Sequence, residues 1–315
     1  MQAEVLISTT EMDHQDWLDQ RRKGIGGSDA ASIAGVNRWK SPIGVYLEKI
    51  GEAPESKPLN EEAAYWGNVH EETVAKEFSK RTGLKVRRRN AILKHPDYDW
   101  ILGNVDRMIV GKKEGLECKT ASEYLKSEWE GEEIPISYLL QCQHYMAVTG
   151  YQAWWIAVLI GGNKFVYKRI ERDEELIETL IGIEKDFWEN HVLKKVPPLM
   201  DGSQASEDLI KALYPESEPD SEIELPSESK AMIQQFEEAK QAEKEAAERK
   251  KEAENRLKNL LGTFEKGFAD THVVTWKQHV RNNFDSKTFK KEHPDLYKKY
   301  AKSSPQRRFS IKEAN

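Results

Sequence analysis

The chain has 315 residues, of which 32% are charged and 38% hydrophobic, and its formal net charge is −6. This length supports one large or two modest domains with a sizeable core, and the charge excludes a uniformly basic surface for nucleic acid. The charge is uneven, however, because residues 264–315 carry twelve Lys and Arg against six Asp and Glu. A basic tail on an acidic body indicates a polyanion or an acidic partner near the C-terminus, although a solvated helix face explains it equally well.

Missing patterns exclude several classes of protein. The two cysteines, Cys118 and Cys142, lie in apolar periodic segments, so we expect reduced core thiols in a cytoplasmic protein. Two cysteines are too few for a four-cysteine iron–sulfur cluster or a zinc ribbon. The N-terminus lacks a signal-peptide pattern, no apolar run is long enough to span a membrane, and no P-loop motif indicates ATP.

The first predicted helix, Met12–Lys23, ends in basic residues and leads into a glycine turn before a segment of small apolar residues. A glycine turn at a helix N-terminus behind arginines is a ready anion site, because backbone N–H groups and cationic side chains converge there. An ordinary connection between two helices is the alternative. The candidate anion-binding residues are Arg21, Arg22, Gly26, Gly27 and Ser28.

Two more helices are predicted, Pro42–Ile50 and Asn60–Thr82. The second carries Glu71 and Glu72, which become candidates for chemistry only if this helix packs beside the hairpin that follows. The next segment, Leu84–Leu93, is strand-like and contains three consecutive arginines, which either face a DNA backbone or edge a sheet.

A β-hairpin is predicted from the apolar runs Ile101–Val110 and Leu116–Thr120, which flank a short polar stretch. Because strand side chains alternate, Glu117 and Lys119 share one face. We expect a turn with an even number of residues, which puts Asp106 opposite Lys119 and diagonal to Glu117 on that same face.

Two carboxylates and a lysine on one strand face suggest a Mg²⁺ site, because hard carboxylate oxygens hold this ion and a lysine can act on its water. A solvated hairpin face with an ion pair is the alternative, and this spacing alone does not separate the two.

The helix Pro135–Thr149 is predicted next, and it carries Gln141 and Gln143 among apolar residues. A strand hairpin, Gln152–Ile160 with Lys164–Glu171, follows around a Gly-Gly-Asn turn, and a helix spans 173–193.

Three domains are expected: a globular domain over residues 1–198, an acidic linker over 199–228 and a C-terminal module over 229–315. The module begins with a long helix, Ser229–Leu261, and continues with two short strands, Val273–Lys277 and Arg308–Ile311, around a basic helix, Ser286–Tyr300.

Several stretches together resemble a known family: WLDQRRKGIGGSDAASIAG from Trp17, WGNVHEE from Trp66, and GNVDRMIV, LECKT and YLLQCQHYMAVTG up to Gly150. The resemblance is to YqaJ-type viral recombinases, phage exonucleases of the lambda type within the PD-(D/E)XK nuclease superfamily, and to a prophage-borne bacterial member in particular. It covers residues 17–196, and nothing carries over to the rest of the chain.

The resemblance implies an α/β core in which a twisted mixed sheet is flanked by helices. It also implies Mg²⁺- or Mn²⁺-dependent 5′→3′ digestion of double-stranded DNA ends, which leaves 3′ single strands for phage-type recombination by strand annealing. A homotrimeric ring and a single-strand annealing recombinase are the implied assembly and partner.

Family roles carry over onto named positions. The metal ligands fall on Asp106, Glu117 and the backbone carbonyl of Cys118, and the catalytic lysine falls on Lys119. The helix-borne glutamate, for a second metal or its water, falls on Glu71, and the Q-x-Q helix on Gln141 and Gln143. The 5′-phosphate grip falls on Arg21 and Ser28, with Arg22 as an alternative.

Two other functions stay open on the same fold. One is a structure-specific or restriction-like endonuclease, which would cut closed circular DNA. The other is a catalytically inactive scaffold that binds DNA ends, which the intact set of Asp106, Glu117 and Lys119 disfavours.

Overall fold

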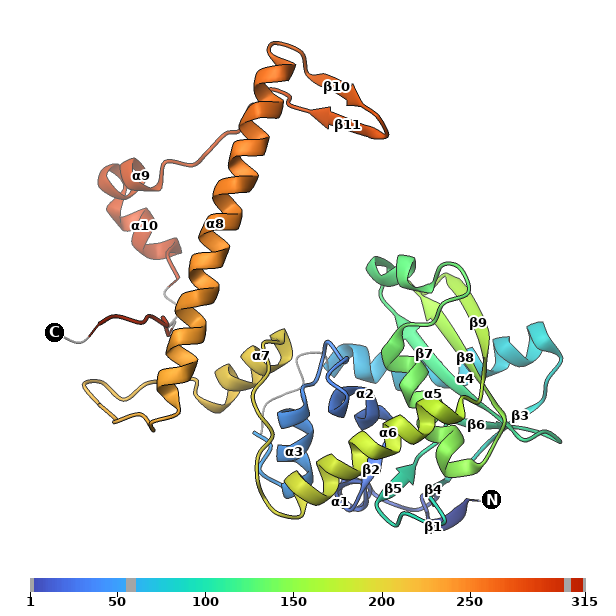
Figure 1. Ribbon diagram of the computed structural model, residues 1–315. Coiled ribbons are helices and arrows are strands. Elements are labelled where there is room, and N and C mark those ends of the chain that lie inside the picture. Colours follow the sequence, from blue (N-terminus) through green and yellow to red (C-terminus); the bar gives the residue numbers. More distant parts are fainter. Residues whose placement is uncertain (1–2, 55–60, 303–306, 314–315) are drawn as a thin grey trace. The chain divides into compact units, whose positions relative to one another are not determined.

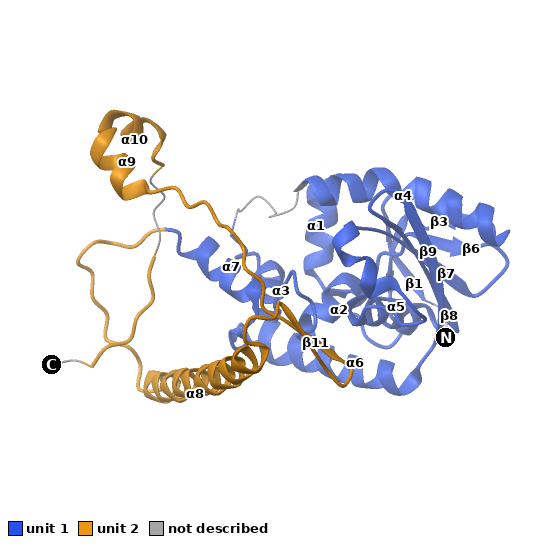
Figure 2. Cartoon of the chain, turned by 90° about the horizontal axis from the view of Figure 1, so that it is seen from above, with its two compact units in different colours: residues 1–215 blue, residues 216–315 orange. Residues whose placement is uncertain are grey.

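The computed structural model describes residues 3–54, 61–302 and 307–313 and divides into two compact units, residues 1–215 and 216–315 (Figure 2). The first unit contains two mixed β-sheets with helices on their faces, which confirms the expected α/β class (Figure 1). The second contains one long helix, a hairpin and two short helices.

The larger sheet has the strand order β3-β6-β7-β8-β9, with β7 and β8 parallel and the other neighbours antiparallel. Helix α4 covers one face, where its Phe78 packs with Leu116 and Cys118, and α5 covers the other, where its Met146 packs with Ile156. The elements are β3 Val86–Arg88, β6 Arg107–Ile109, β7 Glu114–Ala121, β8 Ala153–Ile160, β9 Lys164–Glu171, α4 Glu61–Thr82 and α5 Ile136–Thr149.

The smaller sheet has the order β1-β4-β5-β2, and the short strand β2 lies parallel to β5. Helix α2 begins directly after β2 and packs against α5, so the glycine turn lies where the two sheets approach each other (Figure 1). The elements are β1 Glu4–Ser8, β2 Ile25–Gly26, β4 Ala91–Lys94, β5 Ile101–Gly103, α1 His14–Arg22, α2 Gly27–Ile33 and α3 Pro42–Ile50.

The prediction of one strand over Ile101–Val110 is wrong. The run is divided between β5 in the smaller sheet and β6 in the larger one, and Asp106 lies in the segment that crosses between them. The strand-like segment Leu84–Leu93 is divided in the same way into β3 and β4. Both halves of each run are apolar, so hydrophobic periodicity shows no break where the chain changes sheets.

The hairpin turn has an even number of residues, as expected, but the register is shifted by two. Arg107 pairs with Leu116 and Met108 with Gly115, which places Asp106 in line with Glu117 rather than with Lys119. The shift preserves the face, because side chains repeat every two residues along a strand.

Other elements match their predictions closely. Helix α3 and the hairpin of β8 and β9 are confirmed, and the helix from Glu174 to Asp186, α6, continues as a π-helical turn, Phe187–Val192. The expected start of α4 at Asn60 lies outside the described residues. A 3₁₀ segment, Glu123–Trp129, follows β7.

In the last third, one segment contains an unexpected helix and one predicted strand is wrong. The expected linker contains helix α7, Gln204–Leu213, which packs on α3 within the first unit. No strand forms at Arg308–Ile311 in the described part of the tail. The boundaries at residues 198 and 228 stay a prediction about folding domains.

The second unit begins with the predicted helix α8, Ser229–Leu261. The remaining elements are the hairpin of β10 Lys266–Ala269 with β11 His272–Thr275, and helices α9 Ser286–Glu292 and α10 Pro294–Tyr300 in place of one basic helix. Among the residues that the structure describes, no helix combines the length and apolar character needed to cross a bilayer.

A buried ion pair joins α5 to α6. His144 Nδ1 lies 2.7 Å from Glu184 Oε1, and its Nε2 lies 2.8 Å from the carbonyl oxygen of Leu102 on β5. Both ring nitrogens face oxygen atoms that can accept a hydrogen bond, an arrangement that favours the doubly protonated imidazolium. Burial alone would lower the pKa of His144, but the Glu184 carboxylate and the Leu102 carbonyl outweigh it and raise that pKa.

We predict that Glu184→Gln lowers the free energy of unfolding near pH 6 by about 3 kcal/mol, because it leaves a buried cation without its counter-ion. The raised pKa of His144 in the folded state means that the pair stabilises fully below pH 6.5, and that this contribution is lost as pH rises through the folded value. Urea unfolding across pH 6–9 measures both effects. The exposed Glu178→Gln on the same helix is the control, and an equal loss there contradicts the prediction.

Candidate active site

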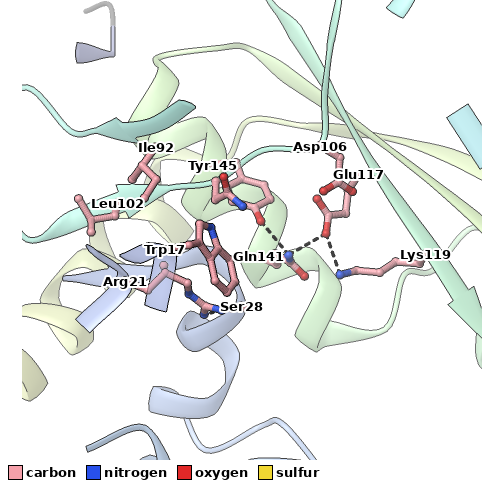
Figure 3. A pocket seen from close by; sticks show the side chains of 13 residues that line it. Trp17, Arg21, Ser28, Ile92, Leu102, Asp106, Glu117, Lys119, Gln141 and Tyr145 are labelled. Atoms are coloured by element: carbon pink, nitrogen blue, oxygen red, sulfur yellow. Dashed lines mark hydrogen bonds and ion pairs between the residues drawn. The ribbon is translucent and has the colours of Figure 1, made fainter. Parts of the chain in front are cut away.

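A cavity of about 260 Å³ opens between the two sheets, beside the N-termini of α2 and α5 (Figure 3). It brings most of the predicted site residues together, although they come from segments more than 100 residues apart in sequence. Its lining comprises Trp17, Arg21, Gly26, Gly27, Ser28, Ile92, Leu102, Asn104, Asp106, Glu117, Lys119, Gln141 and Tyr145.

The carboxylates and the lysine form one end of this cavity. Lys119 Nζ lies 2.7 Å from Glu117 Oε1 on the same face of β7. The Asp106 carboxylate reaches across from the crossing segment, where its Oδ2 accepts a hydrogen bond of 2.8 Å from the backbone N–H of Cys118. The Cys118 side chain points to the opposite face, into the core under α4. Strand alternation therefore presents Glu117 and Lys119 to the cavity, and the crossing segment brings the Asp106 carboxylate to the same side.

Helix α5 holds Glu117 in place. The Gln141 amide nitrogen donates to Glu117 Oε1 at 2.8 Å and to the Tyr145 hydroxyl at 2.9 Å, as the dashed lines in Figure 3 show. Both interactions are buried, so they are stronger than their counterparts in water. Gln141 thus fixes the orientation of one carboxylate, and Tyr145 fixes Gln141.

Protonation at this end is strongly perturbed. Burial, followed by the negative charge of Glu117, raises the pKa of Asp106 well above its usual value. Burial by itself would lower the pKa of Lys119, but attraction to Glu117 and Asp106 outweighs burial and raises it. Lys119 is therefore a cation at neutral pH.

The donor set fits a divalent cation. The second carboxylate oxygen of Glu117, Oε2, is buried and has no hydrogen-bond partner, which is costly unless a cation meets it. Within the described residues, no group of three or more His, Cys, Asp or Glu side chains is arranged to hold a metal ion. Two carboxylates suit Mg²⁺, which keeps several waters and is often bound through only one or two of them.

Cations surround a buried carboxylate at the other end of the cavity. Asp29 is fully buried and faces Lys49 at 2.6 Å, with Arg21 and Lys40 each at 3.4 Å. Burial raises the pKa of Asp29, but these three cations outweigh it and hold the pKa well below its usual value. Lys40 also pairs with Glu48 at 2.6 Å, so three cations face two carboxylates and this end of the cavity keeps one excess positive charge.

Of these three cations, Arg21 lines the cavity. Its Nη2 donates to the Ser28 hydroxyl at 2.8 Å, and its guanidinium lies 4.9 Å from the centre of the Trp17 ring. Arg22 is instead exposed and pairs with Asp19 at 2.9 Å, so of the two predicted alternatives Arg21 lines the cavity and Arg22 does not.

Gly26 and Gly27 contribute through their backbone and through the absence of a side chain. The Gly26 N–H donates to Asp29 Oδ2 at 3.2 Å, so that amide already has an acceptor, and its expected role in binding an anion stays a prediction. A Cβ at Gly27 would lie 2.5 Å from the Tyr145 ring, so glycine there permits close packing of α2 on α5.

Glu71 lies next to the carboxylates but does not line the cavity. Its carboxylate is paired with the guanidinium of Arg107, which is 3% exposed and also binds Glu72 at 3.0 Å. The Arg107 guanidinium also donates to the backbone carbonyl of Asp106 at 2.9 Å, so one arginine ties α4 to the crossing segment. The charge of Glu71 still reaches Asp106, whose pKa it helps to raise.

Gln143 lies outside the site. Its amide donates to the Glu171 carbonyl at 2.8 Å and accepts from the Asp173 N–H at 3.1 Å, so it joins α5 to the end of β9. The structure thus gives the two glutamines of the Q-x-Q segment different tasks.

Sequence reasoning missed several residues of the site. Asp29, Lys49 and Tyr145 carry no recognisable motif, and their roles depend on contacts between distant segments. Arg107 follows Asp106 directly, so a buried cation could have been suspected there, but its partners on α4 could not.

Comparisons with known proteins agree on one family. Residues 16–152 match the YqaJ-like viral recombinase domain. The uncharacterized protein YqaJ of Bacillus subtilis (strain 168) is 48% identical over 315 residues, which span 99% of this chain and 98% of that protein.

Two solved structures are similar to part of the chain at low identity. An alkaline exonuclease (LHK-Exo) from Laribacter hongkongensis, in complex with dAMP, matches 58% of this chain and 94% of its own, at 18% identity and a TM-score of 0.49. A phage-related exonuclease from Haemophilus somnus 129PT matches 57% of this chain and 99% of its own, at 13% identity and a TM-score of 0.41.

We predict that Mg²⁺ raises the melting temperature of the protein and that Asp106→Asn abolishes this increase. The variant removes one of two carboxylates, while the Asn oxygen still accepts from Cys118. In EDTA the variant should be at least as stable as the parent, because two buried negative charges no longer repel each other. Thermal unfolding with and without Mg²⁺ measures both effects. Exposed Glu175→Gln is the control, and an unchanged Mg²⁺ response in Asp106→Asn contradicts the prediction.

Proposed function

The chain belongs to the YqaJ-like viral recombinase family, and from this membership we propose that it is a Mg²⁺- or Mn²⁺-dependent exonuclease. Its substrate is the end of a DNA duplex, which it digests 5′→3′ to leave a 3′ single strand for recombination by annealing. One observation carries the proposal: a single cavity joins a carboxylate–lysine end to an electropositive end.

The carboxylate end supplies the groups that phosphodiester hydrolysis requires. Asp106 and Glu117 would hold the ion, with the Cys118 carbonyl as a further proposed ligand. A divalent ion bound there would stabilise the negative charge on a phosphate oxygen and lower the pKa of a water molecule bound to it. Lys119 stays protonated because its pKa is raised, so it orients the attacking water and stabilises negative charge on the phosphate rather than accepting a proton.

Gln141 and Glu71 act through the carboxylates. The Gln141 amide is engaged with Glu117 and Tyr145, so we assign it the positioning of Glu117. Glu71 is the proposed ligand of a second ion or of its water. That role requires its ion pair with Arg107 to be shared or broken.

The electropositive end determines which DNA terminus is degraded. Arg21 and Ser28 would bind the terminal 5′-phosphate, since a guanidinium and a hydroxyl are strong donors to phosphate oxygens. The excess of cations around Asp29 favours a dianion over a neutral 5′-hydroxyl. Anchoring the terminus beside the carboxylates restricts cleavage to bonds near the 5′ end.

Assembly and partner follow from the family alone. A homotrimeric ring around the duplex would keep the enzyme on its substrate, and a single-strand annealing recombinase would take up the 3′ strand as it forms.

We predict that the protein, with Mg²⁺ but not EDTA, releases label from the 5′ ends of a linear duplex before the 3′ ends and leaves closed circular DNA intact. Lys119→Ala should abolish this cleavage but retain binding to DNA ends, because it removes the cation and not the anchoring groups. Lys113→Ala, in the exposed hairpin turn, is the matched control. Cutting of closed circles would favour the endonuclease, and the absence of any metal-dependent cleavage would favour the inactive scaffold.

We predict that Arg21→Ala reduces the rate on 5′-phosphorylated ends at least tenfold relative to 5′-hydroxyl ends, because it removes a charged hydrogen bond worth about 1.5–3 kcal/mol. Arg22→Ala, which removes an equal charge one residue away, should leave the ratio unchanged. The two substrates are compared at subsaturating DNA. An equal ratio in the parent and in Arg21→Ala would reject the phosphate site.

A further inference from the structure

Strand β3 carries cations that the proposed active site does not use. It is an edge strand of the larger sheet. Lys85, Arg87 and Arg89 occupy alternate positions in and beside it, with Lys85 and Arg87 exposed and Arg89 half-buried. Across the described ranges of the chain, none of these three side chains forms an ion pair. Three uncompensated positive charges therefore lie in a row, in a protein whose net charge is −6.

The central member of the row, Arg87, lies on the same side of the sheet as the proposed catalytic groups. Arg88 points to the α4 side, since its guanidinium lies 3.3 Å from Glu72 Oε2. Its neighbour Arg87 therefore points to the opposite side. Arg87 pairs with Met108 of β6, whose side chain packs in the core on the α5 side. Glu117 is held by α5 on that same side.

One end of the row lies beside the cavity. The register brings β3 closer to Asp106 from Val86 to Arg88, so the end at Arg89 is the nearer one. Arg87 is opposite Met108, and Met108 is two residues from Asp106. With strands about 4.8 Å apart and a rise of about 3.3 Å per residue, the Cα atoms of Arg87 and Asp106 are roughly 8 Å apart. The positive charges thus start next to the carboxylates and run along the sheet edge.

We propose that Lys85, Arg87 and Arg89 bind the phosphate backbone of the duplex whose end occupies the cavity. This inference rests on the proposed function, because it takes DNA as the substrate. Arginine is suited to the task, since its planar fork matches phosphate oxygens. The row holds the part of the duplex that has not yet been digested and sets its direction of entry.

Protection of the sheet edge is the competing explanation. Charged side chains on an edge strand prevent it from pairing with another chain. Charge of either sign serves that purpose, whereas phosphate binding requires positive charge. Reversing the sign therefore separates the two explanations.

The experiment measures binding of a linear duplex in EDTA as a function of salt concentration. Arg87→Gln/Arg89→Gln should reduce the slope of log K against log salt by about 2, since each lost phosphate contact contributes about 0.9. Arg87→Glu/Arg89→Glu should weaken binding roughly tenfold or more at low salt and remain monodisperse. The control, Lys185→Glu/Lys194→Glu, changes net charge equally at exposed positions on α6 and after the π-helical turn.

Each outcome decides the question. Loss of affinity and slope in the β3 variants, with the control unchanged, supports the proposal. Unchanged binding, or an equal loss in the control, overturns it. Aggregation of the uncharged Gln variant, together with normal DNA affinity of the Glu variant, identifies edge protection as the role. Binding is measured without metal, so the result does not depend on cleavage. Absence of Mg²⁺-dependent degradation by the parent protein would instead reject the proposed function.

Discussion

The repulsion between two buried carboxylates is the constraint on which the rest of the site depends. Asp106 and Glu117 lie in line on neighbouring segments, and burial together with their shared negative charge raises the pKa of Asp106. Such an arrangement is stable only if cations or donors compensate it. Lys119 and the Gln141 amide engage one oxygen of Glu117, the Cys118 N–H engages Asp106, and the other oxygen of Glu117 is left without a partner. The fold thus holds two buried carboxylates whose negative charge is only partly compensated, so a cation bound between them would stabilise the site.

The cavity exists because the chain changes sheets at Asp106. Strand β5 ends in the smaller sheet and β6 begins in the larger one, so the crossing segment forms a wall between them. Leu102 contributes to the cavity from the smaller sheet and Glu117 from the larger. A continuous strand would have left the carboxylates on an open sheet face, without the electropositive end opposite them. Arg107 fixes this crossing through its contacts with α4 and with the Asp106 carbonyl.

Features with a local cause were predictable from the sequence. Helix α8 has its predicted bounds because its composition favours helix throughout, and the hairpin of β8 and β9 follows from its two glycines at positive φ. The shared face of Asp106 and Glu117 followed from period-two alternation, which survived a register error of two residues. The change of sheets, the pairing of Glu71 with Arg107 and the burial of His144 against Glu184 could not be predicted. The two side-chain pairs join residues 36 and 40 positions apart, and the change of sheets depends on which strands pair with each half of the run. A single sequence contains no local signal for either.

Tyr145 touches both ends of the cavity. Its ring packs against the backbone of Gly27 so closely that no side chain fits there, and its hydroxyl accepts from the amide that holds Glu117. The interval between the anchoring groups and the hydrolytic groups is therefore set by a rigid aromatic ring in the protein core, and not by mobile loops. If the terminus is anchored as proposed, the length of the fragment released in each turnover is a property of core packing. Substitutions at the surface would then alter how fast or how long the protein works on DNA, whereas a different product size would require α2 and α5 to be repacked.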